Sequence, residues 1–382
     1  MSISKIRMTT QSMSRRGFIR KSVTVGGITL CAAALGAGCS VPRWRHAVRD
    51  IRRPPVISNE KRQLFTELVR MGTLASNSHN AQAWTFAIDE EGISIFPDFS
   101  RSLPVVDPTY HHLFVSLGCA AENIVQAAPS LGFQPIVNVS DSSGTKHIRI
   151  ALQKNKATHE NMALTIPKRS CSRSTYDGNS VGRLALARLA GAADDDVNID
   201  LLFHPKELTA VSELVIAANT CQVNNAAYRE ELKSWIRFNK RQAYYTRDGI
   251  FAAASGSPTA PPWIARLVFD RAYTAKNENE KLRAQMASTP CVGVFTVKGN
   301  TWKDWINVGR VCQRLSLYAT AMNIAHAHVN QPIEVSSVRR RLASLLGRSG
   351  SYPDLVMRIG YGPSMPRSLR RPVHDVLQSP VT

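Results

Sequence analysis

The sequence predicts an α+β fold built from helices and antiparallel hairpins. Strand-forming residues flank the Asp-Glu-Glu-Gly segment at 89–92 and a Ser-Ser-Gly segment at 142–144, which indicates two β-hairpins. Between the hairpins, apolar residues recur at three- and four-residue steps from Leu113 to Leu131, as on the buried face of a helix. Strands and helices alternate irregularly, so α+β fits better than a doubly wound parallel sheet.

The individual elements follow from local signals. Asp107 is the expected N-cap of the helix between the hairpins, with Pro108 as its first helical residue and Gly132 as its C-cap. Residues 246–290 contain Gly-Ser-Pro and Ala-Pro-Pro clusters and are predicted to form an inserted lid over a site. Helices are also predicted at 60–75, 207–219, 228–239, 305–322 and 337–346, and strands at 84–88, 93–96, 136–139, 147–150, 198–203, 291–297 and 355–361.

A helix late in the chain repeats the apolar pattern of the helix between the hairpins. When Gly118 is aligned with Gly309, four further apolar positions coincide along the helix and just after it. One interpretation is that two core helices share a common pattern. The other is a duplicated half-domain packed about a pseudo-two-fold axis. Duplication predicts two related halves, 58–160 and 161–382, in a monomer that acts as a pseudo-dimer.

The positive charge is concentrated at two ends of the chain. The 382 residues carry a formal net charge of +20, which taken alone suggests nucleic acid or an anionic membrane as partner. Residues 1–53 contribute +10 and residues 339–371 contribute +7, whereas residues 54–338 contribute only +4. Because most of the chain is nearly neutral, no nucleic-acid partner is expected. A hydrophobic content of 43% also excludes a disordered chain.

The N-terminal segment has the pattern of an export signal. Residues 14–21 have the sequence Ser-Arg-Arg-Gly-Phe-Ile-Arg-Lys and precede an apolar run at 23–38. The Arg15-Arg16 pair, followed by a spacer, two apolar residues and a lysine, resembles the twin-arginine (Tat) signal. This resemblance implies that residues 1–39 form a signal peptide for the twin-arginine export machinery, and that the protein acts in the periplasm or envelope.

Two interpretations of Cys39 and of the basic segment after it stay open. The Leu-Gly-Ala-Gly-Cys sequence that ends at Cys39 resembles a lipobox, which implies a lipoprotein anchor, yet glycine stands where a branched apolar residue is usual. The arginines of 43–53 suit an anionic membrane surface beside such an anchor. They suit a solvated basic spacer at 40–57 equally well.

No metal site is predicted. Five of the seven cysteines lie beyond residue 39, and no two cysteines have Cys-x-x-Cys spacing, which excludes a zinc ribbon and a disulfide framework. His79, His111 and His112 have no partner ligand at metal spacing.

Three polar segments are the candidates for chemistry. The first, at 75–84, places Ser78, Asn80, Gln82 and Trp84 between a helix and a strand. Its hydrogen-bonding groups suit the edge of a flat heterocycle, and they also suit an Asx turn that caps the helix.

The other two segments are basic. The segment at 167–174 combines cations with hydroxyl donors, which suits a phosphate or a solvated surface. The segment at 360–371 follows the last strand, and its glycines allow close backbone approach while its arginines suit an anion. The candidate residues of these two segments are Lys168, Arg169, Ser170, Arg173, Gly360, Tyr361, Arg367 and Arg370.

Taken in order, the three segments resemble the FMN-binding nitroreductase superfamily, and more closely its fused two-half, Acg-like branch. The resemblance covers about residues 60–375 and implies a nitroreductase-like fold with FMN as cofactor. It implies that the first segment touches the flavin ring and that the basic segments hold its phosphate and edge. An Asn-Gln-Pro turn of the branch is matched by Asn330 and Gln331. Asn77 and Ala83 depart from the pattern, because both replace prolines.

The resemblance implies an FMN-dependent oxidoreductase that takes electrons from NAD(P)H or another donor and reduces a small electron-poor substrate. No side chain is assigned a catalytic role, because water or substrate can supply the proton. One alternative is a non-catalytic protein that stores FMN or senses redox state beneath a lid. A flavin-free envelope protein that retains the fold is a third interpretation.

Overall fold

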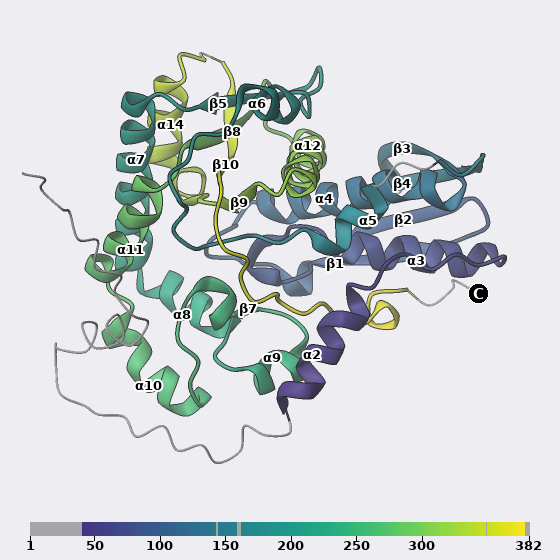
Figure 1. Cartoon of the computed structure of the whole chain (residues 1–382), viewed down its shortest axis with the longest axis horizontal. Coiled ribbons are helices and arrows are strands. Elements are labelled where there is room, and N and C mark those ends of the chain that lie inside the picture. The colour runs from purple at the N-terminus through teal and green to yellow at the C-terminus, as the bar shows by residue number, and fades with distance from the viewer. Residues whose placement is uncertain (1–39, 143, 159–161, 349, 379–382) are drawn as a thin grey trace, which may run out of the picture. The chain divides into compact units, whose positions relative to one another are not determined.

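Two four-stranded antiparallel sheets form the framework of the fold, which confirms the predicted α+β class. The computed structural model describes residues 40–142, 144–158, 162–348 and 350–378 (Figure 1), so the predicted signal with Arg15, Arg16 and Cys39 lies outside the described residues. The first sheet contains β1 (Trp84–Ile88), β2 (Gly92–Pro97), β3 (Phe133–Ser142) and β4 (Thr145–Lys154), and the second contains β5 (Val197–Leu202), β8 (Cys291–Val297), β9 (Ala325–His328) and β10 (Tyr352–Gly360).

The two sheets share one topology. Their strand orders are β1-β2-β4-β3 and β5-β8-β10-β9. In the chain, helix α4 (His111–Ala127) separates the second and third strands of the first sheet, and α12 (Trp302–Ala321) does the same in the second. Helix α3 (Lys61–Thr73) precedes β1, and α6 (Arg183–Ala190) precedes β5. The order helix-strand-strand-helix-strand-strand therefore occurs twice.

Helices α4 and α12 cross through a pair of glycines. A Cβ placed on Gly118 would lie 2.0 Å from the carbonyl oxygen of Ile306, and a Cβ on Gly309 would lie 2.0 Å from that of Val115. Val115 precedes Gly118 by three residues and Ile306 precedes Gly309 by three, so the two contacts are reciprocal. Reciprocal contacts of this kind are typical of a two-fold interface.

Helix α4 begins later than the sequence predicts. Its first residue is His111, and its N-cap is Tyr110 with a φ of 62°. Asp107 accepts hydrogen bonds from two backbone N–H groups at the start of the helix, at 2.9 and 3.1 Å. The predicted capping role of Asp107 is thus retained from a position ahead of the helix, but Pro108 lies outside it and the prediction for Pro108 was wrong.

A helical insertion separates β5 from β8. It starts earlier than the lid predicted at 246–290, because α7 already begins at Pro205. At the equivalent place in the first half, β1 and β2 are joined only by a short turn. Its elements are α7 (Pro205–Asn224), α8 (Ala226–Trp235), β6 (Ile236–Arg237), α9 (Lys240–Thr246), β7 (Ile250–Phe251), α10 (Pro262–Ala272) and α11 (Ala275–Ala287). The remaining helices are α5 (Met162–Thr165), α13 (Gln331–Glu334) and α14 (Ser336–Leu345).

The segment predicted as a basic spacer is folded against the rest of the protein over most of its length. Helix α2 (Ser40–Ile51) packs against α9, and its Trp44, Ala47 and Ile51 are buried. A solvated spacer is therefore wrong for these residues, because an apolar face at three- and four-residue spacing holds the helix in place. Neither α2 nor any other helix in the described part of the chain is long and apolar enough to cross a membrane.

Candidate functional site

The polar loop between α3 and β1 is held in a strained conformation. His79, Asn80 and Gln82 have φ angles of 49°, 54° and 54°, in the left-handed region that residues other than glycine seldom occupy. Asn77 closes the loop, because its Oδ1 accepts from the backbone N–H of Gln82 over 3.0 Å. Strain of this kind persists only where the surroundings enforce it, and it is concentrated at ligand sites.

Two distant segments enforce this conformation. Asn80 Nδ2 donates to one carbonyl in 247–249 and one in 369–371, over 3.0 and 3.1 Å. Gln82 Nε2 donates to a carbonyl of the first segment over 2.9 Å, and its Oε1 accepts from an N–H of the second over 2.8 Å. Trp84 is fully buried at the start of β1. In this structure Asn80 and Gln82 brace the loop, and a contact from them to flavin stays a prediction.

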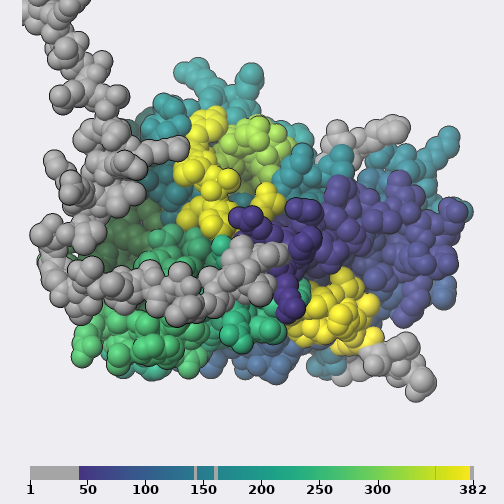
Figure 2. All heavy atoms as spheres, turned by 60° about the horizontal axis from the view of Figure 1, so that its bottom comes forward, coloured from purple at the N-terminus to yellow at the C-terminus, as the bar shows by residue number. Residues whose placement is uncertain are grey.

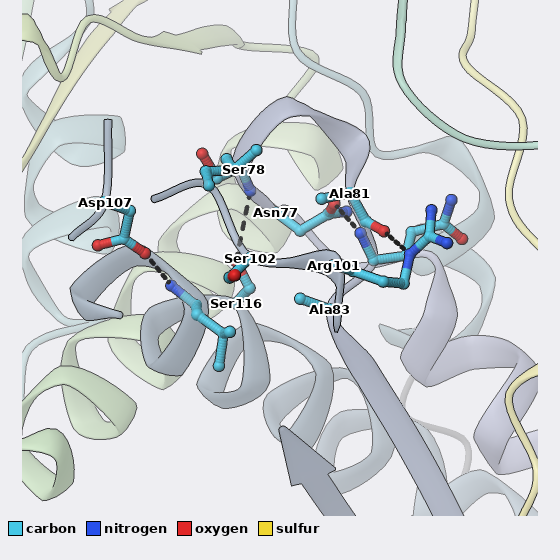
Figure 3. A pocket seen from close by; sticks show the side chains of 11 residues that line it. Asn77, Ser78, Ala81, Ala83, Arg101, Ser102, Asp107 and Ser116 are labelled. Carbon is cyan, nitrogen blue, oxygen red and sulfur yellow. Dashed lines mark hydrogen bonds between the residues drawn. The ribbon is translucent and has the colours of Figure 1, made fainter. Parts of the chain in front are cut away.

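A small pocket lies beside this loop (Figure 3). The backbone N–H of Ser78 donates to Ser116 Oγ over 3.3 Å, and the Ser78 hydroxyl lies 3.2 Å from His79 Nδ1. Two of the predicted loop residues, Ser78 and Gln82, thus line a concave surface. The lining residues are Asn77, Ser78, Ala81, Gln82, Ala83, Arg101, Ser102, Leu103, Asp107, Leu113 and Ser116.

Arg169 is the buried cation of the second polar segment. Only 2% of its surface is exposed, and its Nη2 donates to the carbonyl of Leu74, just after α3, over 2.9 Å. Its Nε is buried without a hydrogen-bond partner. Lys168 is exposed, whereas Ser170 and Arg173 are half-buried. The interior position therefore belongs to Arg169 and not to Lys168.

The third polar segment brings two more arginines to the same place. Arg370 is buried and donates to two carbonyls within 73–75, over 2.8 and 3.1 Å. Arg367 donates to two carbonyls within 167–169, over 2.6 and 3.0 Å. Arg367 therefore joins the two basic segments, which are far apart in the sequence, and Arg370 joins the third segment to the end of α3.

The other predicted residues of the second half have contacts within the fold. A Cβ on Gly360 would lie 2.7 Å from the Tyr176 ring, so the glycine permits close packing there. The carbonyl of Tyr361 accepts from a backbone N–H over 2.9 Å. Asn330 Oδ1 accepts from a β10 N–H over 3.0 Å, and Gln331 Oε1 is buried and unpaired. The structure does not bring these four residues to the buried arginines through any of these contacts.

A further buried arginine, Arg52, joins Arg169, Arg370 and the half-buried Arg367, and it is absent from the sequence prediction. It directly follows α2, and its Nη1 donates to two carbonyls of 167–169 over 2.8 and 3.0 Å, while its Nε is unpaired. The helical spacing of apolar residues in α2 could have identified it, because that spacing predicts a buried helix end and Arg52 directly follows it. We call Arg52, Arg169, Arg367 and Arg370 the guanidinium cluster.

The guanidinium cluster is positive charge without a buried counter-charge. None of its members forms an ion pair with a carboxylate in the described residues, and the oxygen atoms that accept their hydrogen bonds are backbone carbonyls. Burial and then the charge of Arg169 lower the pKa of Arg370 to about 9. Burial and then the other three arginines lower the pKa of Arg52. Charges buried in this way need an anion nearby, and guanidinium groups suit phosphate or carboxylate oxygens.

The positive charge of Arg169 or Arg173 acts on three histidines, His79, His326 and His328. His326 and His328 alternate with alanines on β9, so both point to one side of the sheet. Burial first, and a neighbouring arginine in addition, lowers the pKa of His79 to about 4 and the pKa of each strand histidine to about 3. All three are therefore neutral at physiological pH. Strand β9, which carries His326 and His328, was not predicted, although its Ala-His-Ala-His alternation indicates a strand.

His111 and His112 each face a carboxylate that is distant in the sequence. His111 Nε2 lies 3.3 Å from Asp354 Oδ1, and His112 Nε2 lies 3.4 Å from Glu334 Oε1. Burial lowers the pKa of His111 to about 3 and raises that of Asp354 to about 7. Within the described residues, no group of three or more His, Cys, Asp or Glu side chains is placed to hold a metal ion.

Comparison with known proteins gives a distant relative. No model of a protein family matches the chain. A protein of Mycobacterium tuberculosis, from strains H37Rv and CDC 1551, bears the provisional name NAD(P)H nitroreductase. It is 23% identical over 327 residues, which cover 82% of this chain and 90% of the relative.

Two solved structures illustrate the similarity in three dimensions. A nitroreductase with bound FMN from Bacteroides fragilis is 16% identical, with a TM-score of 0.34 over 56% of this chain and 96% of that chain. The NADPH:FMN oxidoreductase of Vibrio harveyi, complexed with NAD+, is 12% identical, with a TM-score of 0.35 over 58% of this chain and 78% of that chain.

Proposed function

We propose that this chain is an FMN-dependent oxidoreductase of the nitroreductase type, which takes electrons from NAD(P)H and reduces a small electron-poor substrate. The observation that carries the proposal is the guanidinium cluster, because a phosphate dianion offsets buried positive charge that no carboxylate offsets. The name of the Mycobacterium tuberculosis relative, which matches most of both chains, supports the same activity.

The residues present fit the phosphate of FMN. Arg52 and Arg169 each keep a buried, unpaired Nε–H, which is a donor without a use in the protein alone. Arg367 and Arg370 bind the carbonyls of 167–169 and 73–75, and so hold the backbone on which the donors depend. Each charge-assisted hydrogen bond to a phosphate contributes about 1.5–3 kcal/mol.

The strained loop and Arg173 suit the ring of the cofactor. FMN, when bound, accepts a hydride from a nicotinamide and passes electrons on to the substrate. The loop offers hydrogen-bonding groups on a backbone that its braces keep rigid, which favours one orientation of a bound ring. The charge of Arg173 reaches His79 in this loop and His328 on β9. A cation beside the loop favours the electron-rich form of a bound ring.

We attribute the repeated topology to two fused nitroreductase-like halves that form a pseudo-dimer within one chain. Two observations support this: the matching strand order of the two sheets with equivalent helices α3/α6 and α4/α12, and the reciprocal packing of Gly118 and Gly309. A single chain of this kind needs no partner subunit to complete its site.

Cofactor binding tests the proposal. We expect the purified protein to bind one FMN per chain, and Arg169→Gln to weaken FMN binding at least ~tenfold. Arg348→Gln is the matched control, because Arg348 pairs with Asp200 at the surface. Inorganic phosphate, added without FMN, should raise the melting temperature of the wild-type protein more than that of Arg169→Gln. Protein that stays colourless and binds no added FMN would contradict the proposal.

Anaerobic reduction separates the enzyme from its alternative. If the bound FMN is bleached by NADPH and recoloured by a nitroaromatic or quinone, the chain is an oxidoreductase. FMN that stays oxidised under anaerobic NADPH and NADH but is reduced by dithionite would favour storage or redox sensing. The braces from 247–249 onto the 77–82 loop are the observation that favours this alternative, because they tie part of the insertion to the site.

We also propose that the protein is exported through the twin-arginine route and works in the periplasm or envelope. The motif at 14–21 supports this. Replacing Arg15 and Arg16 by lysines should retain the protein in the cytoplasmic fraction, whereas the same replacement at Arg43 and Arg45 should not. Metabolic labelling with a fatty acid, lost in Cys39→Ser, would establish the lipid anchor.

A further inference from the structure

The outer face of α10 is apolar and exposed. Trp263, Leu267 and Val268 are 71%, 66% and 44% exposed, whereas Phe269 on the opposite side is buried against α8 and its neighbours. Residues four apart lie on one face of a helix, so Trp263 and Leu267 form a ridge. An exposed tryptophan and leucine at helical spacing indicate a surface that binds a membrane or another molecule.

Basic side chains surround this ridge. Arg266 and Arg271 of α10 are exposed. Helices α2, α9 and α10 carry seven lysines and arginines against two carboxylates, Asp50 and Asp270, and Asp270 is paired with Lys233 of α8. The local charge is therefore strongly positive, although most of the chain is nearly neutral.

Helix α2 extends the same surface. It contacts α9, and Lys240 of α9 lies over the Trp44 ring at 5.7 Å. Its Arg43, Arg45 and Arg49 are exposed. In Figure 1 helices α2, α9 and α10 lie along one edge, and Figure 2 turns that edge toward the viewer. In the sequence, Cys39 directly precedes the first residue of α2.

We propose that α10, together with the arginines of α2, docks onto the surface of an anionic phospholipid bilayer. Trp263 and Leu267 enter the boundary between headgroups and acyl chains, where an amphipathic indole is most stable. The arginines contact lipid phosphates and keep their charge in the headgroup layer. A protein partner would need a complementary acidic surface, whereas a bilayer supplies negative charge and an apolar layer together. The proposal does not depend on FMN.

Vesicle binding tests the docking surface. Ser40–Thr382 forms one compact unit with its own core, so the assay uses this part of the chain and leaves out the apolar run at 23–38. We expect sedimentation with vesicles of phosphatidylcholine and phosphatidylglycerol, and little with phosphatidylcholine alone or in high salt. Trp263→Ala/Leu267→Ala should weaken binding at least ~tenfold. Replacing Arg43, Arg45 and Arg49 by glutamine should weaken it about a hundredfold.

The control and the spectroscopic readout make the test specific. Leu184→Ala on α6 removes an 89% exposed leucine outside the proposed surface and should leave binding unchanged. A blue shift of tryptophan fluorescence on vesicle addition should be lost in Trp263→Phe, although five other tryptophans remain. Failure of the wild-type protein to bind anionic vesicles would overturn the proposal. Binding that depends on the arginines and not on Trp263 and Leu267 would also overturn it.

Discussion

Adding a single methyl group at the crossing of α4 and α12 should destabilise the protein strongly. In Gly118→Ala the new Cβ would lie 2.0 Å from the Ile306 carbonyl oxygen, and real contacts of this kind stay beyond 3.0 Å. The helices must therefore separate by about 1 Å or bend. Overpacking of a core costs about 1–3 kcal/mol and more where backbone must move, against about 1 kcal/mol gained from helix propensity. Because backbone must move here, the cost lies at or above the upper end of that range, and we expect a net loss of about 2 kcal/mol or more in the free energy of unfolding.

Urea denaturation followed by circular dichroism measures this loss. Gly309→Ala should cost about as much as Gly118→Ala, because its Cβ would meet the Val115 carbonyl at the same distance. The double variant should lose less than the two single losses together, since the first methyl already separates the helices for the second. Gly191→Ala is the control, because its Cβ would make only ordinary contacts at 3.5 Å. A Gly118→Ala variant as stable as the wild type would refute the described crossing.

Three further perturbations test other parts of the structure. Folding lowers the pKa values of His326 and His328 from 6.5 to about 3, so the unfolded chain binds more protons than the folded chain below pH 6.5. Acidification to pH 5 should therefore lower the free energy of unfolding by about 2 kcal/mol per histidine. A flat profile between pH 7 and 5 would contradict this, and replacing either histidine by glutamine should reduce the slope. Asn77→Ala removes the acceptor for the Gln82 N–H and should cost about 1–2 kcal/mol and weaken FMN binding, whereas unchanged binding would show that the loop keeps its shape without it. Glu122→Gln leaves Arg310 and Arg314 of α12 without their buried carboxylate and should lower the free energy of unfolding by about 3 kcal/mol, measured by thermal or urea unfolding. A loss under ~1 kcal/mol would contradict the role of these ion pairs.

Regular elements with a strong apolar period were predictable from the sequence. The hairpins and central helices appear where the spacing of residues such as Trp84 and Leu113 predicts them, because one face of each is buried in a shared core. The insertion was delimited poorly. Its first helix was predicted as an ordinary helix of the second half, because the Gly-Ser-Pro and Ala-Pro-Pro clusters that indicate an insertion occur only after residue 246.

Charge patterning misled the prediction where burial overrides it. The arginines of 43–53 indicate a solvated segment by composition, yet Trp44 and Ile51 fix α2 in the core and carry Arg52 inside. Lys168 and Arg169 are adjacent and similar in the sequence, but one is exposed and the other buried. Only the three-dimensional position of the carbonyls after α3 distinguishes them, and no local pattern encodes that position.

The guanidinium cluster draws on equivalent places in the two halves. Arg52 lies in the segment before α3, and Arg169 lies in the segment before α6, and the two meet because Arg52 donates to the Arg169 carbonyl over 2.8 Å. If the halves are related by a pseudo-two-fold axis, segments that meet each other in this way lie close to that axis. A symmetric pair of chains would place two such sites about the axis.

The two halves of the proposed pseudo-dimer differ at the places where such sites would form. The strained loop between helix and strand spans 74–83 in the first half, whereas its counterpart in the second half spans only 191–196 and contains no positive φ. The second half instead carries the helical insertion, whose 247–249 segment braces the loop of the first. Each half therefore supplies a different part: the strained loop comes from the first, and the basic segment at 167–174 with the 247–249 brace comes from the second. The proposed fusion of two halves in one chain would allow this division, because two identical subunits cannot specialise separately.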